Sequence, residues 1–259
     1  MNGLFLGIAL LLFATLANTK EKTFEVYDNK VLRVCSSRNL PFSTTNLSGF
    51  ENKIATFIAK KLKILRVEYT WHPLGVGFIR NTLNTNLCDL VLSTTLKNGL
   101  LLNTNPYYQS AYVFVYRQHE NLKIKHLSDK NLQYLRIGLS NNTPPLSVLL
   151  ESGFDYQLHY YPLLVDNRYY SVQQKMIDDL LAKKIDVAIA WGPSIGNNVQ
   201  KYANKLQMTK LKDKKMYFKI SMGVRNGEIE LKHRINRILR KHRTAINAIL
   251  KSYNVPLVL

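Results

Sequence analysis

The sequence has few groups that could carry out chemistry. Its 17 acidic residues are scattered over 259 positions, and no two of its six histidines have the spacing of a metal site such as His-Glu-x-x-His. It has no nucleophile elbow and no glycine loop that would cradle a phosphate. We therefore expect no catalytic residue, no metal site and no cofactor, and we interpret the chain as a binding protein rather than an enzyme.

Long hydrophobic runs are also absent, with one exception at the start of the chain. Met1–Ala17 carries no charged side chain, and its apolar run Leu4–Leu16 is shorter than the ~20 residues that a membrane helix needs. The small residues at its end predict a secretory signal (1–17) cleaved near Ala17, followed by a polar mature tail (18–30). An uncleaved anchor remains the alternative, because the first residues lack Lys or Arg. We expect an exported protein with no membrane span in the mature chain.

Cysteine is nearly absent, since Cys35 and Cys88 are the only two. Cys35 ends one predicted strand and Cys88 begins another. In a doubly wound unit these strands lie side by side, so a disulfide is geometrically reasonable in an exported chain. Two buried free thiols are the alternative interpretation.

Basic residues are abundant, with 36 Lys and Arg and a net charge of +19. The signal carries none of this charge, so the mature protein retains it. Such a surface attracts an acidic protein, an anionic lipid or a nucleic acid, and the charge alone does not choose among them.

The order of predicted elements indicates an α/β fold of two lobes. The stretch Pro106–Arg117 contains a strand that separates two similar βαβαβ sets, which begin at Val31–Cys35 and at Leu135–Leu139. The polar-then-apolar strand openings at Cys88-Asp89 and Ile185-Asp186 repeat between the sets. We expect each lobe to be a doubly wound, mostly parallel sheet, with two crossing strands and a cleft between the lobes. The predicted boundaries are 31–110 for lobe 1, 111–217 for lobe 2 and 218–259 for the return to lobe 1.

Two predicted helices have clear amphipathic patterns. In Phe50–Leu62 the charged residues, Glu51 among them, are expected on the solvent side. The last helix, predicted over Glu228–Lys251, has a strongly basic face: Lys232, Arg234, Arg237, Arg240, Lys241 and Arg243. We expect this face to dock an acidic protein, although a solvated face is an equal alternative. Nucleic acid is disfavoured, because no aromatic residues are interleaved with these charges and the chain is exported.

A set of short motifs carries a family resemblance over roughly Val31–Pro256. The motifs are Leu32–Cys35, Asn39–Ser43, Gly49–Asn52, Glu68–Trp71, Gly77–Leu83, Cys88–Val91, Thr104–Tyr108, Tyr112–Val115, Arg136–Gly138, Asn142–Pro145, Asp186–Pro193 and Ile220–Arg225. As a set they resemble the type II periplasmic solute-binding protein fold, especially its quinoprotein dehydrogenase-associated branch, the MoxJ/XoxJ-like accessory proteins of methanol oxidation.

The resemblance implies an exported accessory protein of a PQQ-dependent alcohol dehydrogenase. Members of this branch are thought to help the enzyme mature, become active or meet its partners. The implied partner is therefore the quinoprotein alcohol dehydrogenase or its cytochrome, and a small molecule could also occupy the cleft.

One departure from the wider family concerns the ligand clamp. Amino-acid-binding members pair the ligand carboxylate with an Arg in a Thr-x-x-Arg pattern, whereas Thr94–Gly99 places Lys97 there. A lysine does not reproduce the bidentate fork of an arginine. Those members also hold the ligand ammonium with an Asp, where this chain has Trp191 at or next to that place. We therefore expect a groove without the paired charges that hold a free amino acid.

In place of the paired charges, we expect large aromatic side chains to line the cleft. The candidates are Phe42, Trp71, Tyr107, Tyr108, Tyr112 and Trp191. Several could instead fill the cores beneath the loops, and for Trp71 and Tyr112 the core is the favoured interpretation. Two other functions stay open. One is a receptor of an ABC importer for a small non-zwitterionic solute, and the other is an enzyme on the same fold, such as a dehydratase.

Overall fold

The computed structural model describes residues 30–95, 99–163, 165–166 and 169–258. The predicted signal (1–17), most of the predicted tail (18–30) and Lys97 lie outside these ranges. The first described part contains β1 (Val31–Ser36), α1 (Phe50–Leu62), β2 (Arg66–Trp71), α2 (Phe78–Asn81), η1 (Leu83–Thr85), β3 (Leu90–Thr94) and β4 (Leu102–Asn103). β5 (Tyr108–Arg117) follows.

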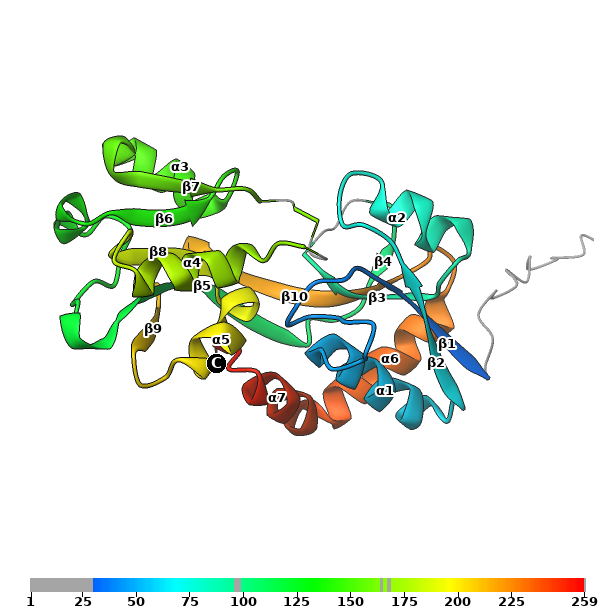
Figure 1. Ribbon diagram of the computed structural model, residues 1–259. Helices are drawn as coiled ribbons and strands as arrows, with labels where there is room; N and C mark the ends of the chain where they lie inside the picture. Colours follow the sequence, from blue (N-terminus) through cyan, green and yellow to red (C-terminus); the bar gives the residue numbers. More distant parts are fainter. Residues whose placement is uncertain (1–29, 96–98, 164, 167–168, 259) are drawn as a thin grey trace, which may run out of the picture.

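The remaining chain builds a similar set and then returns. The set consists of β6 (Ile137–Ser140), α3 (Pro144–Glu151), β7 (Leu158–Tyr161), α4 (Val172–Leu181), β8 (Val187–Trp191), α5 (Gly192–Lys201) and β9 (Leu206–Lys210). The return consists of β10 (Tyr217–Val224), α6 (Ile229–Lys241) and α7 (Arg243–Ser252). Figure 1 shows the two sets side by side, with β5 and β10 running between them.

The strands form two parallel groups joined by crossing strands, in the order β2-β1-β3-β10-β5-β8-β6-β7. β1 is parallel to β2 and β3 in lobe 1, and β6 is parallel to β7 and β8 in lobe 2. β10 and β5 run antiparallel to their neighbours. The predicted fold class, with two lobes and two crossing strands, is confirmed.

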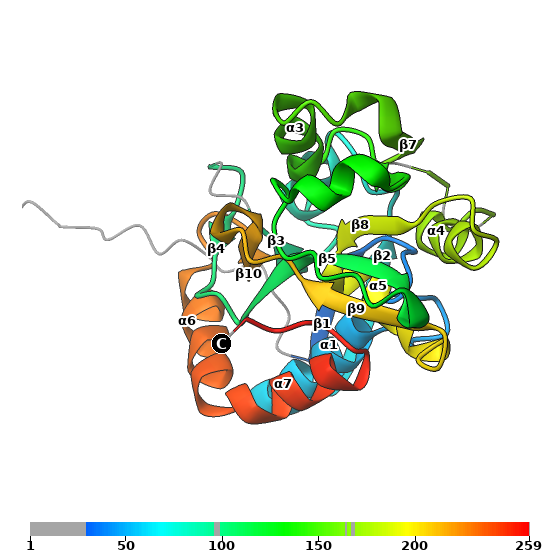
Figure 2. The same ribbon diagram turned by 90° about the vertical axis from the view of Figure 1, so that its left-hand side faces the viewer.

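β5 belongs to both lobes because its two halves have different partners. Residues 108–111 pair with β10, whereas residues 112–117 pair with β8 and β9. β10 changes partner in the same way, from β5 at residues 217–220 to β3 and β4 at residues 221–224. Figure 2 shows β5 and β9 from the side of lobe 2.

Side-chain alternation along the strands supplies a core on each face of each sheet. In lobe 1, Leu32 and Val34 pack with α1, α6 and α7, while Cys35 packs with the α2 region on the other face. In lobe 2, Val113 and Val115 face α4 and α5, whereas Phe114 and Tyr116 face the α3 side. Sheets covered on both faces are the reason that a central parallel strand such as β8 is almost wholly apolar.

Two helices differ from the sequence predictions. The helix predicted over Glu228–Lys251 is two helices, because His242 leaves the helical region with φ −120° and ψ 27° and separates α6 from α7. The bend lets the apolar faces of both helices, with Ile235 and Ile246 fully buried, pack around α1 in one core. α5 was missed because Gly192-Pro193 looks like a turn, yet proline is well suited to the first turn of a helix.

The end of the chain contacts both lobes. After α7, Val258 donates from its backbone nitrogen to the carbonyl of Gln109 at 2.8 Å, and Lys210 Nζ donates to the carbonyl of Leu257 at 2.9 Å. Residue 196 in α5 has to be glycine, because a Cβ there would lie 2.2 Å from the carbonyl oxygen of Asn254. The C-terminal residues therefore bridge β5 of the crossing to β9 and α5 of lobe 2.

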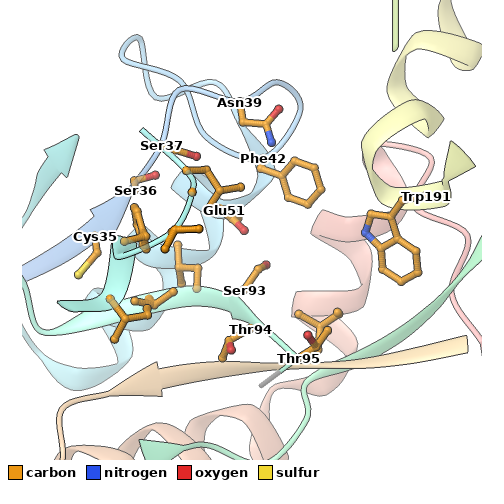
Figure 3. A pocket seen from close by; sticks show the side chains of 18 of the residues that line it. Cys35, Ser36, Ser37, Asn39, Phe42, Glu51, Ser93, Thr94, Thr95 and Trp191 are labelled. Atoms are coloured by element: carbon orange, nitrogen blue, oxygen red, sulfur yellow. The ribbon is translucent and has the colours of Figure 1, made fainter. Parts of the chain in front are cut away.

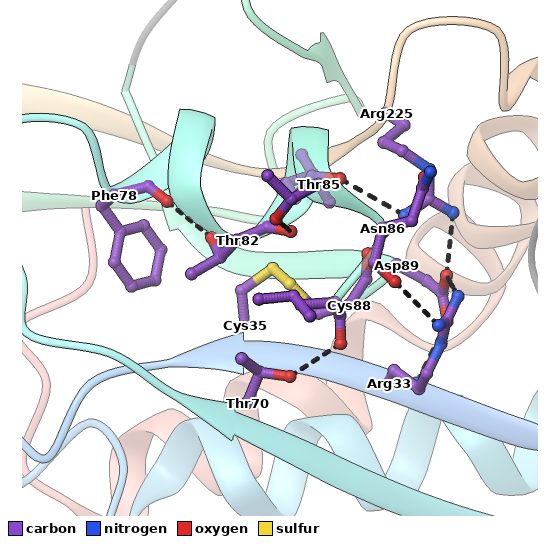
Figure 4. Close-up of a disulfide and its surroundings, with 12 residues drawn as sticks. Arg33, Cys35, Thr70, Phe78, Thr82, Thr85, Asn86, Cys88, Asp89 and Arg225 are labelled. Atoms are coloured by element: carbon purple, nitrogen blue, oxygen red, sulfur yellow. Dashed lines mark hydrogen bonds and ion pairs between the residues drawn. A yellow bond between two sulfur atoms is a disulfide. The ribbon is translucent and has the colours of Figure 1, made fainter.

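A buried cluster of charged residues fixes the outer end of lobe 1 (Figure 4). Asp89, just before β3, is fully buried and accepts from Arg33 Nε at 2.9 Å and Nη2 at 2.6 Å. Arg225, at the end of β10, donates to the same carboxylate at 2.8 Å and to Glu228 at 3.1 Å. Its other nitrogen donates to the carbonyls of Leu83 and Cys88. The cluster thus ties β10 to β1 and to the start of β3.

Lobe 2 repeats this cluster at equivalent positions. Asp186, just before β8, accepts from Arg136 Nε at 2.9 Å and from Arg117 Nη2 at 3.0 Å. Arg117 ends β5 and also pairs with Glu120, three residues later, as Arg225 pairs with Glu228. Its Nη1 donates to the carbonyls of Leu180 and Ile185. These two residues precede Asp186 by the same numbers of positions as Leu83 and Cys88 precede Asp89. Each crossing strand therefore ends in an Arg–Asp–Arg clamp.

The predicted disulfide between Cys35 and Cys88 is confirmed, with Cα atoms 5.3 Å apart. It joins the end of β1 to the turn before β3, and Figure 4 shows it beside the clamp of lobe 1. Both cysteines are buried, at 3% and 0% exposure. The bond therefore closes the segment that contains α1, β2 and α2.

Replacing both cysteines by alanine should lower the free energy of unfolding by about 4 kcal/mol, because the bond closes a segment of 53 residues in the unfolded chain. Urea unfolding of the variant and of the wild-type protein measures this difference. The prediction would be contradicted if reductant left the urea midpoint of the wild-type protein unchanged under conditions in which free thiols are shown to form.

Asp186→Asn should remove part of the acid sensitivity of the protein. The hydrogen bonds from Arg136 lower the pKa of Asp186 to about 2, so its charged form stabilises the folded state above the pKa of the unfolded chain. That stabilisation, on the order of 1 kcal/mol, is lost as pH falls from about 5 to 2. Urea unfolding at several pH values across this range should show that the free energy of unfolding falls less steeply for the variant than for the wild-type protein. Asp155→Asn, at an exposed residue, is the control.

Candidate ligand cleft

A cavity of about 740 Å³ lies between the lobes, at the carboxyl ends of the parallel strands. Lobe 1 contributes the end of β1, the loop before α1, residues 74–80 and the end of β3. The facing side consists of Tyr112, Pro144, Trp191, Phe218 and Ile220. This is the position at which open α/β sheets bind their ligands, because the loops there leave a crevice.

Aromatic rings form the wall on the crossing strands and lobe 2. The centroids of Tyr112 and Trp191 lie 5.5 Å apart, and Phe218 lies 5.7 Å from Trp191 and 6.1 Å from Tyr112. Figure 3 shows Phe42 on lobe 1 facing Trp191 across the cavity. Burial raises the pKa of Tyr112 to about 12, so its hydroxyl stays protonated. The wall therefore offers a large neutral surface for an apolar or aromatic group.

The loop that carries Phe42 is held by its own backbone and by α1. Phe42 donates from its backbone nitrogen to the carbonyl of Asn39 at 2.8 Å, and its ring packs 5.0 Å from Phe50. Asn52 accepts from the backbone nitrogens of Gly49 and Thr44. Residue 49 has no room for a side chain, since a Cβ would lie 2.1 Å from the carbonyl oxygen of Phe42. The lobe 1 side of the cavity is thus preorganised.

A buried carboxyl group, Glu51, lines the same cavity. It is 9% exposed and accepts from Ser43 Oγ at 2.9 Å. Figure 3 shows Glu51 and Ser93 directed toward one another on the lobe 1 wall. Burial raises the pKa of Glu51, and the hydrogen bond from Ser43 opposes this shift. Our expectation that Glu51 faces solvent is wrong, because the first turn of α1 lies beneath the loop rather than at the surface.

Several buried hydroxyl groups surround this carboxyl. Among the described residues, the hydroxyl oxygens of Ser36, Ser93, Tyr107 and Tyr108 have no hydrogen-bond partner that satisfies the usual geometry. Burial is the main cause that raises the pKa of both tyrosines; Glu51 adds to it at Tyr108, and Tyr108 followed by Glu51 adds to it at Tyr107. Ser36 and Ser93 line the cavity, so this region is its polar part.

The structure places the predicted cleft residues in three different environments. Phe42, Tyr112 and Trp191 line the cavity. Tyr107 and Tyr108 lie instead in the core of lobe 1, and Trp71 is half-buried and stacked on Tyr69. Trp71 thus lies outside the cavity, as its favoured interpretation expected, whereas Tyr112, for which the core was favoured, lines it. A sequence does not show on which side of a strand end a ring will pack.

The cavity also contains charged groups that the sequence reasoning missed. Glu51 and the exposed Arg80 both line it, so the groove is not free of charge. Phe218 was missed as well, because it lies on a strand that was considered only as a crossing element. Glu51 lies in the first turn of α1, which the preceding loop covers in the folded protein. The sequence pattern of the helix does not show this cover, so it places Glu51 on the solvent side.

The predicted basic face lies mainly on α6. Arg237, Arg240 and Lys241 are exposed there, and exposed Arg243 begins α7. Lys232 and Arg234 are half-buried. Within the described ranges, no helix has both the length and the apolar composition that a bilayer crossing requires. The same residues contain no group of three or more His, Cys, Asp or Glu side chains placed to hold a metal ion.

Two lobes, two crossing strands and a cavity between them define a two-lobed binding protein. Residues 32–255 match the model of the bacterial extracellular solute-binding proteins, family 3. The chain belongs to this family.

Three similar proteins share most of its length. Protein MoxJ of Methylorubrum extorquens is 31% identical over 94% of this chain and 87% of that protein. The solved structure of the periplasmic binding protein XoxJ from Methylobacterium extorquens AM1 has a TM-score of 0.73 and 38% identity, covering 88% of this chain and 99% of XoxJ. MxaJ from Methlophaga aminisulfidivorans MPT has a TM-score of 0.75 at 24% identity, over 88% of this chain and 100% of MxaJ, and supports the fold alone.

Glu51→Gln should make the stability of the protein less dependent on pH. Because burial raises the pKa of Glu51, the folded state holds its proton more tightly than the unfolded chain, and stability falls as pH rises from 4.5 through the raised pKa. Glutamine keeps an acceptor for Ser43 and carries no charge. Urea unfolding at increasing pH should therefore show a flatter profile for this variant than for the control Glu151→Gln, which alters an exposed carboxyl. Identical profiles for both variants would contradict the prediction.

Proposed function

We propose that this protein is a periplasmic accessory protein of a PQQ-dependent alcohol or methanol dehydrogenase. Similarity to MoxJ over nearly the whole chain, and to XoxJ, supports a role beside such an enzyme. Membership of an extracellular solute-binding family supports a periplasmic location. The partner would be the dehydrogenase or its cytochrome, and the role would be to assist maturation or activation by protein contact, by binding in the cleft, or both.

The observation that carries the proposal is the character of the cavity. A volume of about 740 Å³ exceeds what a small amino acid needs, and Phe42, Tyr112, Trp191 and Phe218 give it an aromatic surface. Leu74 and Val76, both exposed, add apolar groups at its edge. Exposed apolar residues around a cleft favour contact with another protein, because isolated soluble proteins rarely present such a patch without use. A loop of the dehydrogenase is the occupant that we favour.

Co-purification tests this role directly. The tagged protein should retain the dehydrogenase from a periplasmic extract at low salt and lose it at high salt. Trp191→Ala should weaken the association because it removes the centre of the aromatic wall, whereas Tyr134→Ala, at a residue 78% exposed, should leave it intact. Dehydrogenase activity that is unchanged in a strain lacking this protein would overturn the proposal.

A receptor of an ABC importer is the second candidate. The presence of Glu51 and Arg80 in one interlobe cavity favours it, since polar groups within an apolar pocket fix the orientation of small ligands. A thermal-shift screen of metabolites distinguishes the two roles. Tight binding of one small solute, without co-purification of a dehydrogenase, would favour the receptor.

An enzyme on the same fold is the third candidate. A carboxyl group whose pKa is raised, and which lines a cavity, has the environment of a general acid or base. Turnover of a dehydratase substrate by the wild-type protein, abolished in Glu51→Gln, would favour this function over both binding roles.

A further inference from the structure

A second hollow, of about 360 Å³, lies between the C-terminal end of α1 and the outer side of α6. Figure 1 shows these helices adjacent to one another in lobe 1. Basic side chains surround the hollow: Lys61, Lys63, Arg234, Arg237, Lys241 and His242. Leu62 and Ile238 complete its lining. We call this hollow the basic groove.

Three cations of the basic groove have no acidic partner among the described residues. No acidic side chain lines it. In the described part of the chain, Lys61, Arg237 and Lys241 form no salt bridge, and Lys61 Nζ lies 5.5 Å from the centroid of the Phe57 ring. Burial and the charges of Lys61 and Lys241 lower the pKa of His242. Like charges held this close together repel one another, so an anion that enters the groove relieves the repulsion.

The position of Arg234 keeps the groove in shape. Its guanidinium donates to the carbonyl of Leu62 at 3.1 Å and so joins α6 to the end of α1. Lys63, with φ 61° at the end of α1, turns the chain away from the helix axis. These contacts set the separation of the two helices, so the surrounding lysines and arginines converge on one concave surface.

The shape and the apolar lining indicate what kind of anion fits. Leu62 and Ile238 are 7% and 9% exposed and form an apolar base between the cations. A small inorganic anion would leave this apolar base unused. A flat membrane surface does not reach into a concave hollow. An acidic protein segment supplies both an apolar side chain for the base and carboxylates for the rim.

We propose that the basic groove binds an acidic segment of a partner protein, with an apolar side chain against Leu62 and Ile238 and carboxylates beside Lys61, Arg237 and Lys241. The site uses two residues of α1, Lys61 and Lys63, that the basic face of α6 alone does not include. It extends the proposed function by giving the chemistry of a partner surface outside the cleft. The identity of the partner as a dehydrogenase is not required.

A synthetic peptide tests the groove without any assumption about the partner. The probe is blocked Glu-Glu-Leu-Glu-Glu, and its glutamine counterpart is the uncharged control. At low salt the acidic peptide should shift the amide resonances of α1 and α6, and it should raise the pKa of His242 in an NMR titration. Lys61→Glu with Lys241→Glu should weaken binding about tenfold or more, because attraction at the rim becomes repulsion.

The matched variant is Lys214→Glu with Lys215→Glu, which makes the same change in net charge at two exposed lysines in the turn before β10. It should bind the acidic peptide nearly as the wild-type protein does. Equal loss in both double variants would overturn the groove and leave only a general effect of net charge. Tighter binding of inorganic phosphate, or of phosphatidylglycerol vesicles, than of the peptide would also overturn it.

The failure of this proposal is distinguishable from failure of the proposed function. Trp191→Ala alters the cleft and should leave peptide binding unchanged. Normal co-purification of the dehydrogenase with no peptide binding would overturn the groove alone. Peptide binding that depends on Lys61 and Lys241, in a protein that retains no dehydrogenase, would support the groove and count against the dehydrogenase role.

Discussion

The two Arg–Asp–Arg clamps are the interaction on which the rest of the structure depends. Asp89 and Asp186 each receive one arginine from the start of a lobe and another from the end of a crossing strand. Arg117 and Arg225 are buried, so each needs its carboxylate partner to offset the loss of hydration. The matching carbonyl acceptors show that both lobes use the same arrangement. The clamps fix where each crossing strand ends, and therefore how the lobes are connected.

Fixing the outer ends of the strands leaves their carboxyl ends to form the cleft. The parallel strands begin near the clamps, and residues at their carboxyl ends, such as Ser36 and Ser93, line the cavity. β5 and β10 belong to both sheets, so Tyr112 and Phe218 lie between the lobes rather than inside either one. An aromatic wall on the crossing strands is thus a direct consequence of their shared pairing.

The cleft and the basic groove differ in physical character and lie on different elements. The cleft is apolar and aromatic, with one buried carboxyl group at Glu51. The groove is cationic, and it lies on the helices that cover the opposite end of the lobe 1 core. A net charge of +19 explains attraction at long range, whereas the cleft supplies apolar contact at short range. Two such surfaces suit a protein that meets a larger partner.

The sequence by itself determined the elements, the two-lobed fold and the disulfide, because strand alternation, helical periodicity and strand-flanking cysteines are local patterns. The helix Phe50–Leu62 was predicted to the residue. Only the tertiary structure decided that Glu51 is buried, that Tyr107 and Tyr108 enter a core, and that the last helix bends at His242. Those outcomes depend on which segment packs over each residue, and such contacts join residues far apart in the chain. The basic groove has the same origin, since Lys61 and Lys241 are brought together only by the packing of α1 against α6.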